Sequence, residues 1–317
     1  MRVLLVVNAV ASSVTPRRRV VIQKALGADH ELEVAETSRR GHAARLARGA
    51  AIDGVDVVVV LAGDGTLNEA ADGLAGSRTA LAPLPGGSTN VFARTLGLSR
   101  DPVEATAELL ESLDAGSFRR IGLGSVEGRH FLFHCGIGFD AAVIEQAERR
   151  SFVKRFAAPV LFVYAAFETW ARAYDHRRGR FDLAFEDSDV VRDAIFTIVS
   201  NTSPYTFFGS RPVVVAPRAA PDAPFELTIV TSRRMTDMVR VAASALGSGR
   251  FLRRNPGVAQ RHGVHRVRVI GHGRFPYQVD GEFLGEVDEL TIVYEPDVLT
   301  VVTPVDPTRH APDRARS

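Results

Sequence analysis

A run of apolar residues followed by a glycine turn places the strongest constraint on the fold of this chain. Residues 57–62 read Val-Val-Val-Val-Leu-Ala, and Gly63-Asp64-Gly65-Thr66 follow directly. Strands that are apolar along their whole length are typical of parallel sheets, because helices cover both faces of such a sheet. The sequence therefore predicts a central parallel strand with a polar turn at its carboxyl end.

That turn has the composition of a phosphate-binding loop. Gly63 and Gly65 would let backbone N–H groups approach a ligand closely, and Thr66 with Glu69 would form a capping box at the next helix. A helix N-terminus exposed in this way favours phosphate. For this motif taken alone, an ordinary turn between strand and helix with Asp64 as a cap is the alternative.

A second construction of the same kind begins at residue 80. Residues 80–84 are apolar, residues 85–90 read Pro-Gly-Gly-Ser-Thr-Asn, and residues 91–96 have helical spacing. The carboxyl ends of adjacent parallel strands lie at one edge of a sheet, where open α/β sheets bind ligands. We therefore expect the two turns to lie side by side in one phosphate site.

The pattern of predicted elements divides the chain into two domains. Strands and helices alternate as far as residue 113, which is typical of a doubly wound α/β domain with a parallel sheet. Beyond a hairpin predicted at Glu127-Gly128 and a helical interval at 141–177, short strands predict an antiparallel β-sandwich, and those expected include 213–216, 266–270 and 277–279. We place the first domain at residues 1–118 and the sandwich at 119–295.

Composition excludes several classes of protein. The single cysteine, Cys135, excludes intrachain disulfides and a cysteine-based zinc site, and its apolar neighbours indicate a buried thiol. Such cysteine usage suits a reducing cytoplasm. The longest apolar stretch, residues 157–167, is much shorter than the roughly 20 residues that cross a bilayer.

Four motifs that occur in order along the chain resemble those of the diacylglycerol kinase catalytic family, which includes sphingosine kinases, ceramide kinases and soluble bacterial lipid kinases. The motifs are Gly63-Asp64-Gly65-Thr66-Leu67-Asn68-Glu69, Pro85-x-Gly87-Ser88-x-Asn90, Gly136-Ile137-Gly138-Phe139-Asp140-Ala141 and Asp280-Gly281-Glu282. The resemblance covers residues 1–305. It implies an N-terminal nucleotide-binding domain, completed by a returning segment at 296–305, and a β-sandwich domain for a lipid substrate. The polar tail at 306–317 is expected to be disordered.

The resemblance implies an ATP-dependent lipid kinase that transfers the γ-phosphoryl group to a diacylglycerol-like or sphingoid lipid. Asn8 and Thr37 follow the first two predicted strands and match nucleotide-contacting positions of the family. The implied ATP-binding residues are Asn8, Thr37, Gly63, Asp64, Gly65, Thr66, Leu67, Asn68, Glu69 and Ser88. The first loop departs from the family pattern, because residues 8–12 read Asn-Ala-Val-Ala-Ser where Asn-Pro-x-Ser-Gly is common.

Phosphoryl transfer needs positioned phosphates, a cation and a base near the accepting hydroxyl, so ATP and Mg²⁺ are the implied cofactors. The family uses the Asp-Gly-Glu motif in catalysis, which makes Glu282 or Asp280 the proton acceptor. Asp64 is a third candidate, and it would otherwise order its loop or hold Mg²⁺ through water. In soluble bacterial members a structural cation follows an Ala-Pro dipeptide. The corresponding residues 216–224 contain one acid, Asp222. One carboxylate with backbone carbonyls makes a poor set of ligands for Mg²⁺ or Ca²⁺.

Two other functions remain open from the sequence. NAD kinases share the glycine-aspartate loop, although the second turn and the Asp-Gly-Glu motif favour lipid kinases. A nucleotide-gated lipid-binding protein without catalysis is the other alternative, and the retained acids Asp64, Asp280 and Glu282 argue against it. Phe139, Phe207 and Phe208 are candidates for an apolar cleft, or are plain core residues.

Charge is unevenly distributed along the chain. Residues 231–274 contain ten arginines and one acid, Asp237. Together with Arg149, Arg150, Lys154 and Arg155, this section predicts peripheral association with the anionic inner face of the membrane. A solvated, neutral face is the simpler alternative. No nucleic-acid-reading module accompanies the section, and a homodimer is a further open partner.

Overall fold

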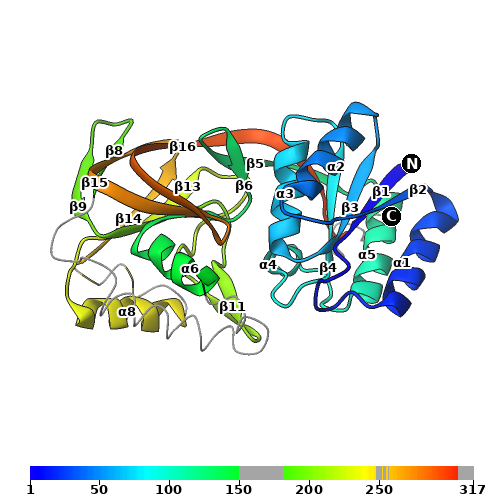
Figure 1. Cartoon of the computed structure of the whole chain (residues 1–317), viewed down its shortest axis with the longest axis horizontal. Helices are drawn as coiled ribbons and strands as arrows, with labels where there is room; N and C mark the ends of the chain where they lie inside the picture. Colours follow the sequence, from blue (N-terminus) through cyan, green and yellow to red (C-terminus); the bar gives the residue numbers. More distant parts are fainter. Residues whose placement is uncertain (150–180, 248–251, 253–254, 256, 306–317) are drawn as a thin grey trace, which may run out of the picture. The chain divides into compact units, whose positions relative to one another are not determined.

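The computed structural model describes residues 1–149, 181–247, 252, 255 and 257–305. The chain divides into two compact units (Figure 1). The first comprises Met1–Ile121 with the C-terminal segment from Val298, and the second comprises Gly122–Asp297. A parallel-sheet α/β unit is thus followed by an antiparallel β-sandwich, which confirms the predicted fold class.

The first unit is built on a parallel sheet. Its strand order is β2-β1-β3-β4, and the end of β16 pairs with β4 at its edge, where Thr300 lies opposite Ala80. The strands are β1 (Arg2–Val7), β2 (Glu31–Glu36), β3 (Val57–Ala62), β4 (Ala80–Pro85) and β16 (Glu282–Val302). Successive strands are added on one side of β1 and then on the other, so strand order reverses between β1 and β3. Such a switch point is where open α/β sheets bind ligands.

Helices cover both faces of this sheet, as Figure 1 shows. One pair is α1 (Pro16–Asp29) with α5 (Pro102–Asp114), and the other is α2 (His42–Ile52) with α3 (Asp64–Leu74). A short helix, α4 (Val91–Thr95), follows β4. Every residue of β3 and β4 is buried, because both faces of these central strands are covered.

The start of α3 differs from the predicted capping box. Gly63 is the N-cap, and no side chain caps this helix. Because the helix begins at Asp64, Thr66 already lies within its first turn. Glu69 instead accepts the backbone N–H groups of Gly41 at 2.8 Å and Ala43 at 3.2 Å, at the start of α2. The predicted box is therefore wrong, and Glu69 holds two neighbouring helices together.

In the second unit, neighbouring strands among the described residues pair antiparallel. One run of paired strands has the order β14-β13-β10-β7-β15-β16. These strands are β7 (His134–Gly138), β10 (Phe196–Ser200), β13 (Phe225–Val230), β14 (Val258–Val264) and β15 (Arg266–Val279). A second run is formed by β8 (Phe181–Phe185), which pairs with both β9 (Val190–Ala194) and β15.

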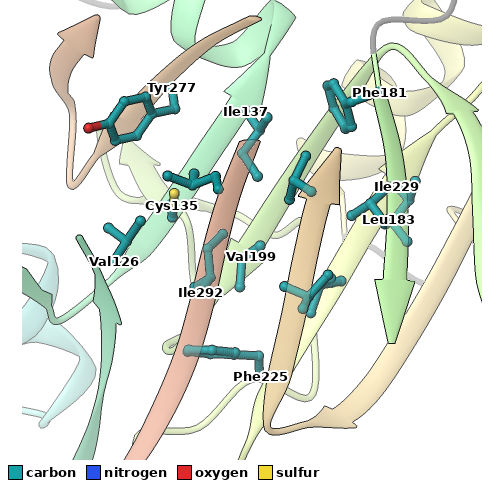
Figure 2. Packing of buried hydrophobic residues seen from close by; sticks show 14 of the residues in the cluster. Val126, Cys135, Ile137, Phe181, Leu183, Val199, Phe225, Ile229, Tyr277 and Ile292 are labelled. Atoms are coloured by element: carbon teal, nitrogen blue, oxygen red, sulfur yellow. The ribbon is translucent and has the colours of Figure 1, made fainter. Parts of the chain in front are cut away.

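Strand β15 forms hydrogen bonds with strands of both layers of the sandwich. Its first half pairs with β8, where Val269 lies opposite Leu183, and its last residues pair with β7, where Val279 lies opposite Cys135. Figure 2 shows the core enclosed in this way, with Phe181, Phe225 and Ile292 among its buried members. Cys135 is fully buried, so the prediction of a buried thiol is confirmed.

The remaining elements include two corrections. The hairpin of β5 (Phe118–Val126) and β6 (Arg129–Phe131) turns at Glu127-Gly128 as predicted, with φ of 49° and 75°. The strand expected at 213–216 is instead β12 (Arg211–Val213), which pairs with β11 (Thr206–Phe208). The segments expected at 266–270 and 277–279 form the single strand β15, because a bulge lets it continue through the interruption.

Two helices complete the second unit, α6 (Phe139–Arg149) and α8 (Met235–Ala245). The helical interval predicted at 141–177 is confirmed as far as residue 149, and the rest lies outside the described residues. The tail at 306–317 and the basic residues Arg150, Lys154 and Arg155 also lie outside them.

Close packing of α2 against α3 yields a test of the fold. A Cβ atom added to Gly73 of α3 would overlap the backbone of Ala44 in α2. We expect Gly73→Ala to lower the free energy of unfolding by about 1–3 kcal/mol, the usual cost of overpacking. Chemical denaturation measures this change.

Gly49 of α2 provides the control, because a Cβ atom there would meet nothing within 4 Å. Gly49→Ala should raise stability by about 0.5–1 kcal/mol through helix propensity alone. Equal stability of the wild type and the Gly73→Ala variant would contradict the close approach of the two helices.

Candidate active site

The first part of the site lies at the switch point of the parallel sheet. Asn8 follows β1 directly, and its backbone N–H donates to the carbonyl of Leu61 in β3 at 3.2 Å. Its side-chain amide donates to Thr66 Oγ1 at 3.3 Å, and its Oδ1 accepts the N–H of Val10 at 3.2 Å. The Asn8 side chain therefore joins the loop after β1 to the turn after β3.

The two glycine turns touch through their backbones, as the sequence predicts. The N–H of Gly86 donates to the carbonyl of Ala62 at 2.9 Å. A Cβ atom on Gly86 would lie 2.7 Å from Ala62 N, and one on Gly87 would lie 2.7 Å from Gly63 Cα. No side chain fits at either position, so glycine is required there by the approach of one turn to the other.

Asp64 shapes the second turn. Its Oδ1 accepts the N–H of Phe92 at 3.3 Å, so the carboxylate caps the short helix α4. Burial raises the pKa of Asp64, while the N–H groups of Val91 and Phe92 act in the opposite direction. Of the roles that the sequence leaves open for Asp64, an ordering role is the one that this geometry supports, although the segment that Asp64 orders is the second turn with α4.

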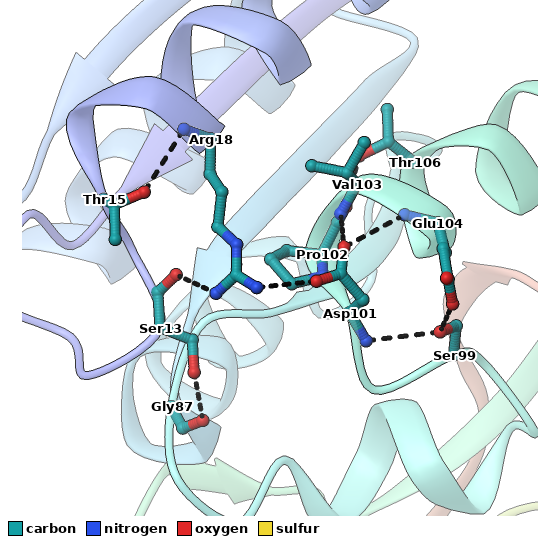
Figure 3. A network of polar contacts seen from close by, with 10 residues as sticks. All are labelled: Ser13, Thr15, Arg18, Gly87, Ser99, Asp101, Pro102, Val103, Glu104 and Thr106. Atoms are coloured by element: carbon teal, nitrogen blue, oxygen red, sulfur yellow. Dashed lines mark hydrogen bonds and ion pairs between the residues drawn. The ribbon is translucent and has the colours of Figure 1, made fainter.

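A polar network fixes the first loop to the same turn, as Figure 3 shows. The hydroxyl of Ser13 donates to the carbonyl of Gly87 at 3.3 Å. The backbone N–H of Ser13 also donates to the carbonyl of Gly86 at 2.8 Å. Arg18 donates to the carbonyl of Ser13 at 3.3 Å and pairs with Asp101 at 2.6 Å. These contacts anchor a loop that lacks the proline and glycine common in the family.

These loops surround a hollow of about 420 Å³. Small ligands commonly occupy pockets of roughly 300–1,000 Å³. Hydroxyls and backbone groups predominate in its lining, which suits phosphate better than an apolar ligand. The lining residues are Asn8, Ala11, Ser12, Gly63, Asp64, Gly65, Thr66, Gly87, Ser88 and Thr89.

Several residues proposed from the sequence lie away from this hollow. Leu67 and Asn68 are buried within α3, and Glu69 is bonded to the start of α2. Thr37 follows β2, and its N–H donates to the carbonyl of Val7 at 2.9 Å. Sequence reasoning missed Ala11, Ser12, Gly87 and Thr89, although the predicted contact of the two turns placed Gly87 nearby.

The Asp-Gly-Glu motif forms the turn between β15 and β16 of the second unit. Asp280 and Gly281 have φ of 49° and 80°, and Val279 lies opposite Glu282. The Asp280 carboxylate accepts three backbone N–H groups, from Leu132 at 2.9 Å, Phe133 at 3.0 Å and His134 at 2.8 Å. Asp280 thus fixes both the turn and the segment that precedes β7.

The two acids of this turn differ in their electrostatic surroundings. Burial raises the pKa of Asp280 to about 7, although the three N–H groups and Arg129 act to lower it. Glu282 pairs with Arg129 at 2.5 Å, and its side chain is 20% exposed. A base whose pKa lies near the working pH is well suited to accept a proton, which favours Asp280 over Glu282.

The residues around Asp222 do not fit a structural cation. Its side chain is exposed, and the adjacent carbonyl of Pro221 accepts the N–H of Gly122 at 2.7 Å and the hydroxyl of Tyr294 at 3.4 Å. Among the described residues no three His, Cys, Asp or Glu side chains gather as metal ligands. We therefore derive no step through a metal at Asp222.

The aromatic residues proposed for a lipid cleft lie on two separate elements, α6 and β11. Phe139 packs against Phe196, with ring centroids 5.9 Å apart, as an ordinary part of the core. Phe207 and Phe208 lie on β11, where Phe208 is 45% exposed. For Phe139 the plain core interpretation therefore holds.

Comparison with known proteins places the chain in a family. The profile of the diacylglycerol kinase catalytic domain matches residues 2–126, and that of the YegS C-terminal NAD kinase beta sandwich-like domain matches residues 134–303. The chain therefore belongs to the diacylglycerol kinase family of lipid kinases, in which a catalytic α/β domain precedes a YegS-type sandwich.

Relatives and solved structures agree with this membership. A diacylglycerol kinase of Bacillus subtilis is 25% identical over 84% of each chain. A probable YegS-like lipid kinase of Chromohalobacter salexigens is 36% identical over 42% of each. The crystal structure of a putative diacylglycerol kinase from Bacillus anthracis has a TM-score of 0.76 at 22% identity, and it aligns over 97% of this chain and 96% of its own.

An NAD kinase from Archaeoglobus fulgidus, solved in complex with ATP, shares the fold more distantly. Its TM-score is 0.53 at 14% identity, with 98% of this chain and 97% of that chain covered.

No helix in the described part of this chain is long and apolar enough to cross a membrane.

Gly65 gives a direct test of the phosphate site. It lies in the first turn of α3, where its φ is not positive and an added Cβ atom would meet nothing within 4 Å. A side chain there would stand in the hollow without straining the fold. We expect Gly65→Val to weaken ATP binding by at least about 1–3 kcal/mol, the scale of lost charged hydrogen bonds, with folding retained. Titration calorimetry measures the affinity.

Gly49→Val is the matched control, because Gly49 is also a helical glycine with open space around it and does not line the hollow. Unchanged ATP affinity in a folded Gly65→Val variant would mean that phosphate binds elsewhere.

Proposed function

We propose that this chain transfers the γ-phosphoryl group of ATP to a hydroxyl of a diacylglycerol-like or sphingoid lipid. The observation that carries the proposal is the backbone contact between the two glycine turns, which places N–H groups and hydroxyls around one polar hollow at the switch point. Family membership supplies the reaction class, and the relatives' names supply the lipid.

Residues of the first unit would hold the nucleotide. The N–H groups at the start of α3 and the hydroxyls of Thr66 and Ser88 line the hollow and suit phosphate oxygens. Asn8 fixes Thr66, and Asp64 fixes the turn that carries Ser88. Mg²⁺ bound together with the nucleotide would neutralise charge that develops on the phosphates.

Asp280 is our choice for the base. Its raised pKa keeps it available to take a proton near neutral pH, while Glu282 is committed to Arg129. Each carboxylate oxygen has two acceptor sites, and among the described residues Asp280 Oδ2 accepts only the N–H of Leu132. This oxygen can therefore accept the proton of a substrate hydroxyl.

Labelled ATP and a panel of acceptors test the function directly. We expect label to appear in a lipid when purified protein is given diacylglycerol, monoacylglycerol, sphingosine or ceramide in mixed micelles, and none to appear in NADP when NAD is the acceptor. Label transferred to NAD alone would favour an NAD kinase. ATP binding without transfer to any acceptor would favour the inactive lipid-binding alternative.

Substitution of the base should separate binding from turnover. Asp280→Asn should lower kcat by about 10²–10⁴-fold, the usual contribution of a general base, with ATP affinity retained. Because the carboxylate must be ionised to act, the wild-type rate should rise with pH through about 7. Steady-state kinetics across pH would follow both effects.

Glu282→Gln is the comparison variant for the same turn. We expect it to retain the pH dependence of the wild type, since it leaves Asp280 in place. A wild-type pH profile in the Asp280→Asn variant would assign the base to another residue.

We further propose that the protein associates peripherally with an anionic membrane from the cytoplasm. The arginines of residues 231–274 are less available to bind anionic lipid than the sequence suggests, because acidic side chains from other segments form ion pairs with several of them. Arg261 pairs with Asp189 at 2.5 Å, and Arg268 pairs with Glu289. The better candidate surface is the outer face of α8, where Val239 is 59% exposed and Leu246, just beyond the helix, is 54% exposed.

Vesicle co-sedimentation tests this surface. The double variant Val239→Ser/Leu246→Ser should bind vesicles of phosphatidylcholine and phosphatidylglycerol roughly tenfold less than the wild type, because apolar area no longer enters the bilayer. Salt should weaken wild-type binding by screening. Val190→Ser on β9 is the control, since Val190 is also exposed, at 41%. Equal binding of the double variant and the wild type would exclude the α8 face.

A further inference from the structure

A buried carboxylate in the second unit takes no part in the chemistry described so far. Asp140 lies in the first turn of α6, just after Gly138, whose φ of 76° turns the chain out of β7. The residue is 8% exposed. Its Oδ1 accepts the hydroxyl of Tyr205 at 2.9 Å, and its Oδ2 accepts the side-chain amide of Gln278 at 2.7 Å.

Gln278 connects this carboxylate to the Asp-Gly-Glu turn. Its side chain is fully buried, and its Oε1 accepts the backbone N–H of Gly281 at 2.8 Å. Gly281 lies between Asp280 and Glu282. A continuous chain of hydrogen bonds therefore runs from Asp140 through both ends of one amide to the backbone of the turn.

The acceptor oxygens of Asp140 determine which way that amide faces. Burial raises the pKa of Asp140, while the hydrogen bonds from Gln278 and Tyr205 act to lower it and favour the carboxylate form. A carboxylate accepts hydrogen bonds and cannot donate them, so the NH₂ end of Gln278 must face Asp140. The carbonyl end is then directed at Gly281, whose N–H needs an acceptor. A neutral, apolar residue at position 140 would leave the amide without this orientation.

The space for the link is provided by a glycine of the same motif. A Cβ atom on Gly136 would overlap both Asp140 Oδ2 and the Gln278 amide. His134 stacks on Tyr205 with ring centroids 4.1 Å apart, and burial lowers the pKa of His134 to about 3. The imidazole is therefore neutral, so the groups that favour the carboxylate form of Asp140 are the hydrogen-bond donors Gln278 and Tyr205.

We propose that Asp140 is a positioning residue that acts through Gln278 to hold the Asp280-Gly281-Glu282 turn in its catalytic conformation. The proposal rests on the proposed function, in which Asp280 is the base. The turn is then fixed from two sides. The Asp280 carboxylate binds the N–H groups of residues 132–134, and Gln278 binds its backbone.

The test compares variants that remove the hydrogen bonds of Gln278, restore them with exchanged partners, or leave them in place. Gln278→Met has a similar length and removes both hydrogen bonds, so we expect kcat to fall by about 10–100-fold with KM for ATP unchanged, since small misplacements are costly to catalysis. The double variant Asp140→Asn/Gln278→Glu exchanges donor and acceptor. An amide at 140 would donate to the carboxylate at 278, which still accepts from Gly281.

We expect the exchanged pair to recover kcat to within about tenfold of the wild type. Tyr205→Phe is the matched control, because it removes the other hydrogen bond to Asp140 and leaves the link to the turn intact. Its kcat should stay within a few-fold of the wild type. Thermal unfolding of each variant shows whether activity merely follows stability.

Three results would overturn the proposal: wild-type kcat in Gln278→Met, a folded exchanged pair as slow as Gln278→Met, or an equal loss in Tyr205→Phe. If Gln278→Met does not fold, the exchanged pair decides. An inactive wild type would instead refute the proposed function. In that case, hydrogen exchange still tests the link, because the Gly281 amide should exchange faster in Gln278→Met than in Tyr205→Phe, and equal rates would refute it.

Discussion

The backbone contact between two glycine turns is the constraint on which the first unit depends. Ala62 and Gly63 lie against Gly86 and Gly87 so closely that a single methyl group would force the turns apart. That approach brings the loops after β3 and β4 to the edge of one hollow, and Ser13 brings the loop after β1 to the same place. The polar site is thus a consequence of how closely two backbones pack, and the side chains around it serve mainly to hold that geometry.

The second unit applies a different principle to its acids. Asp280 and Asp140 are both withdrawn from solvent, which is costly for a carboxylate unless hydrogen-bond donors surround it. Asp280 receives three backbone N–H groups, and Asp140 receives a tyrosine hydroxyl and a glutamine amide. The polar groups therefore fix the conformation of one short turn beside the apolar core of the sandwich. Fully satisfied networks of this kind specify a single arrangement more sharply than packing alone.

Local patterns in the sequence predicted the elements of the fold. They did not predict the pairings between side chains that are distant in sequence. The valine run of β3 and the glycines after it carry their own signal, because strand burial and turn geometry are encoded within a few residues. Glu69 was expected to cap its own helix and caps α2 instead, since helix packing decides where its carboxylate points. The partners of Asp280 are backbone N–H groups near residue 133, which is far away in sequence. The residues next to Asp280 carry no pattern that predicts this contact. In the same way, Asp189 pairs with Arg261 and reduces a charge excess that looked free along the chain.

Burial of the single cysteine has a practical consequence. Cys135 is fully enclosed in the sandwich core, and burial beside Asp280 and Asp140 raises the pKa of its thiol well above the ordinary value. The reactive thiolate is therefore scarce and inaccessible in the folded protein. A cysteine introduced on the surface would be the one thiol that a maleimide or nitroxide reagent modifies. Paired labels, one in each unit, would then report the distance between the units in solution without prior removal of a native residue.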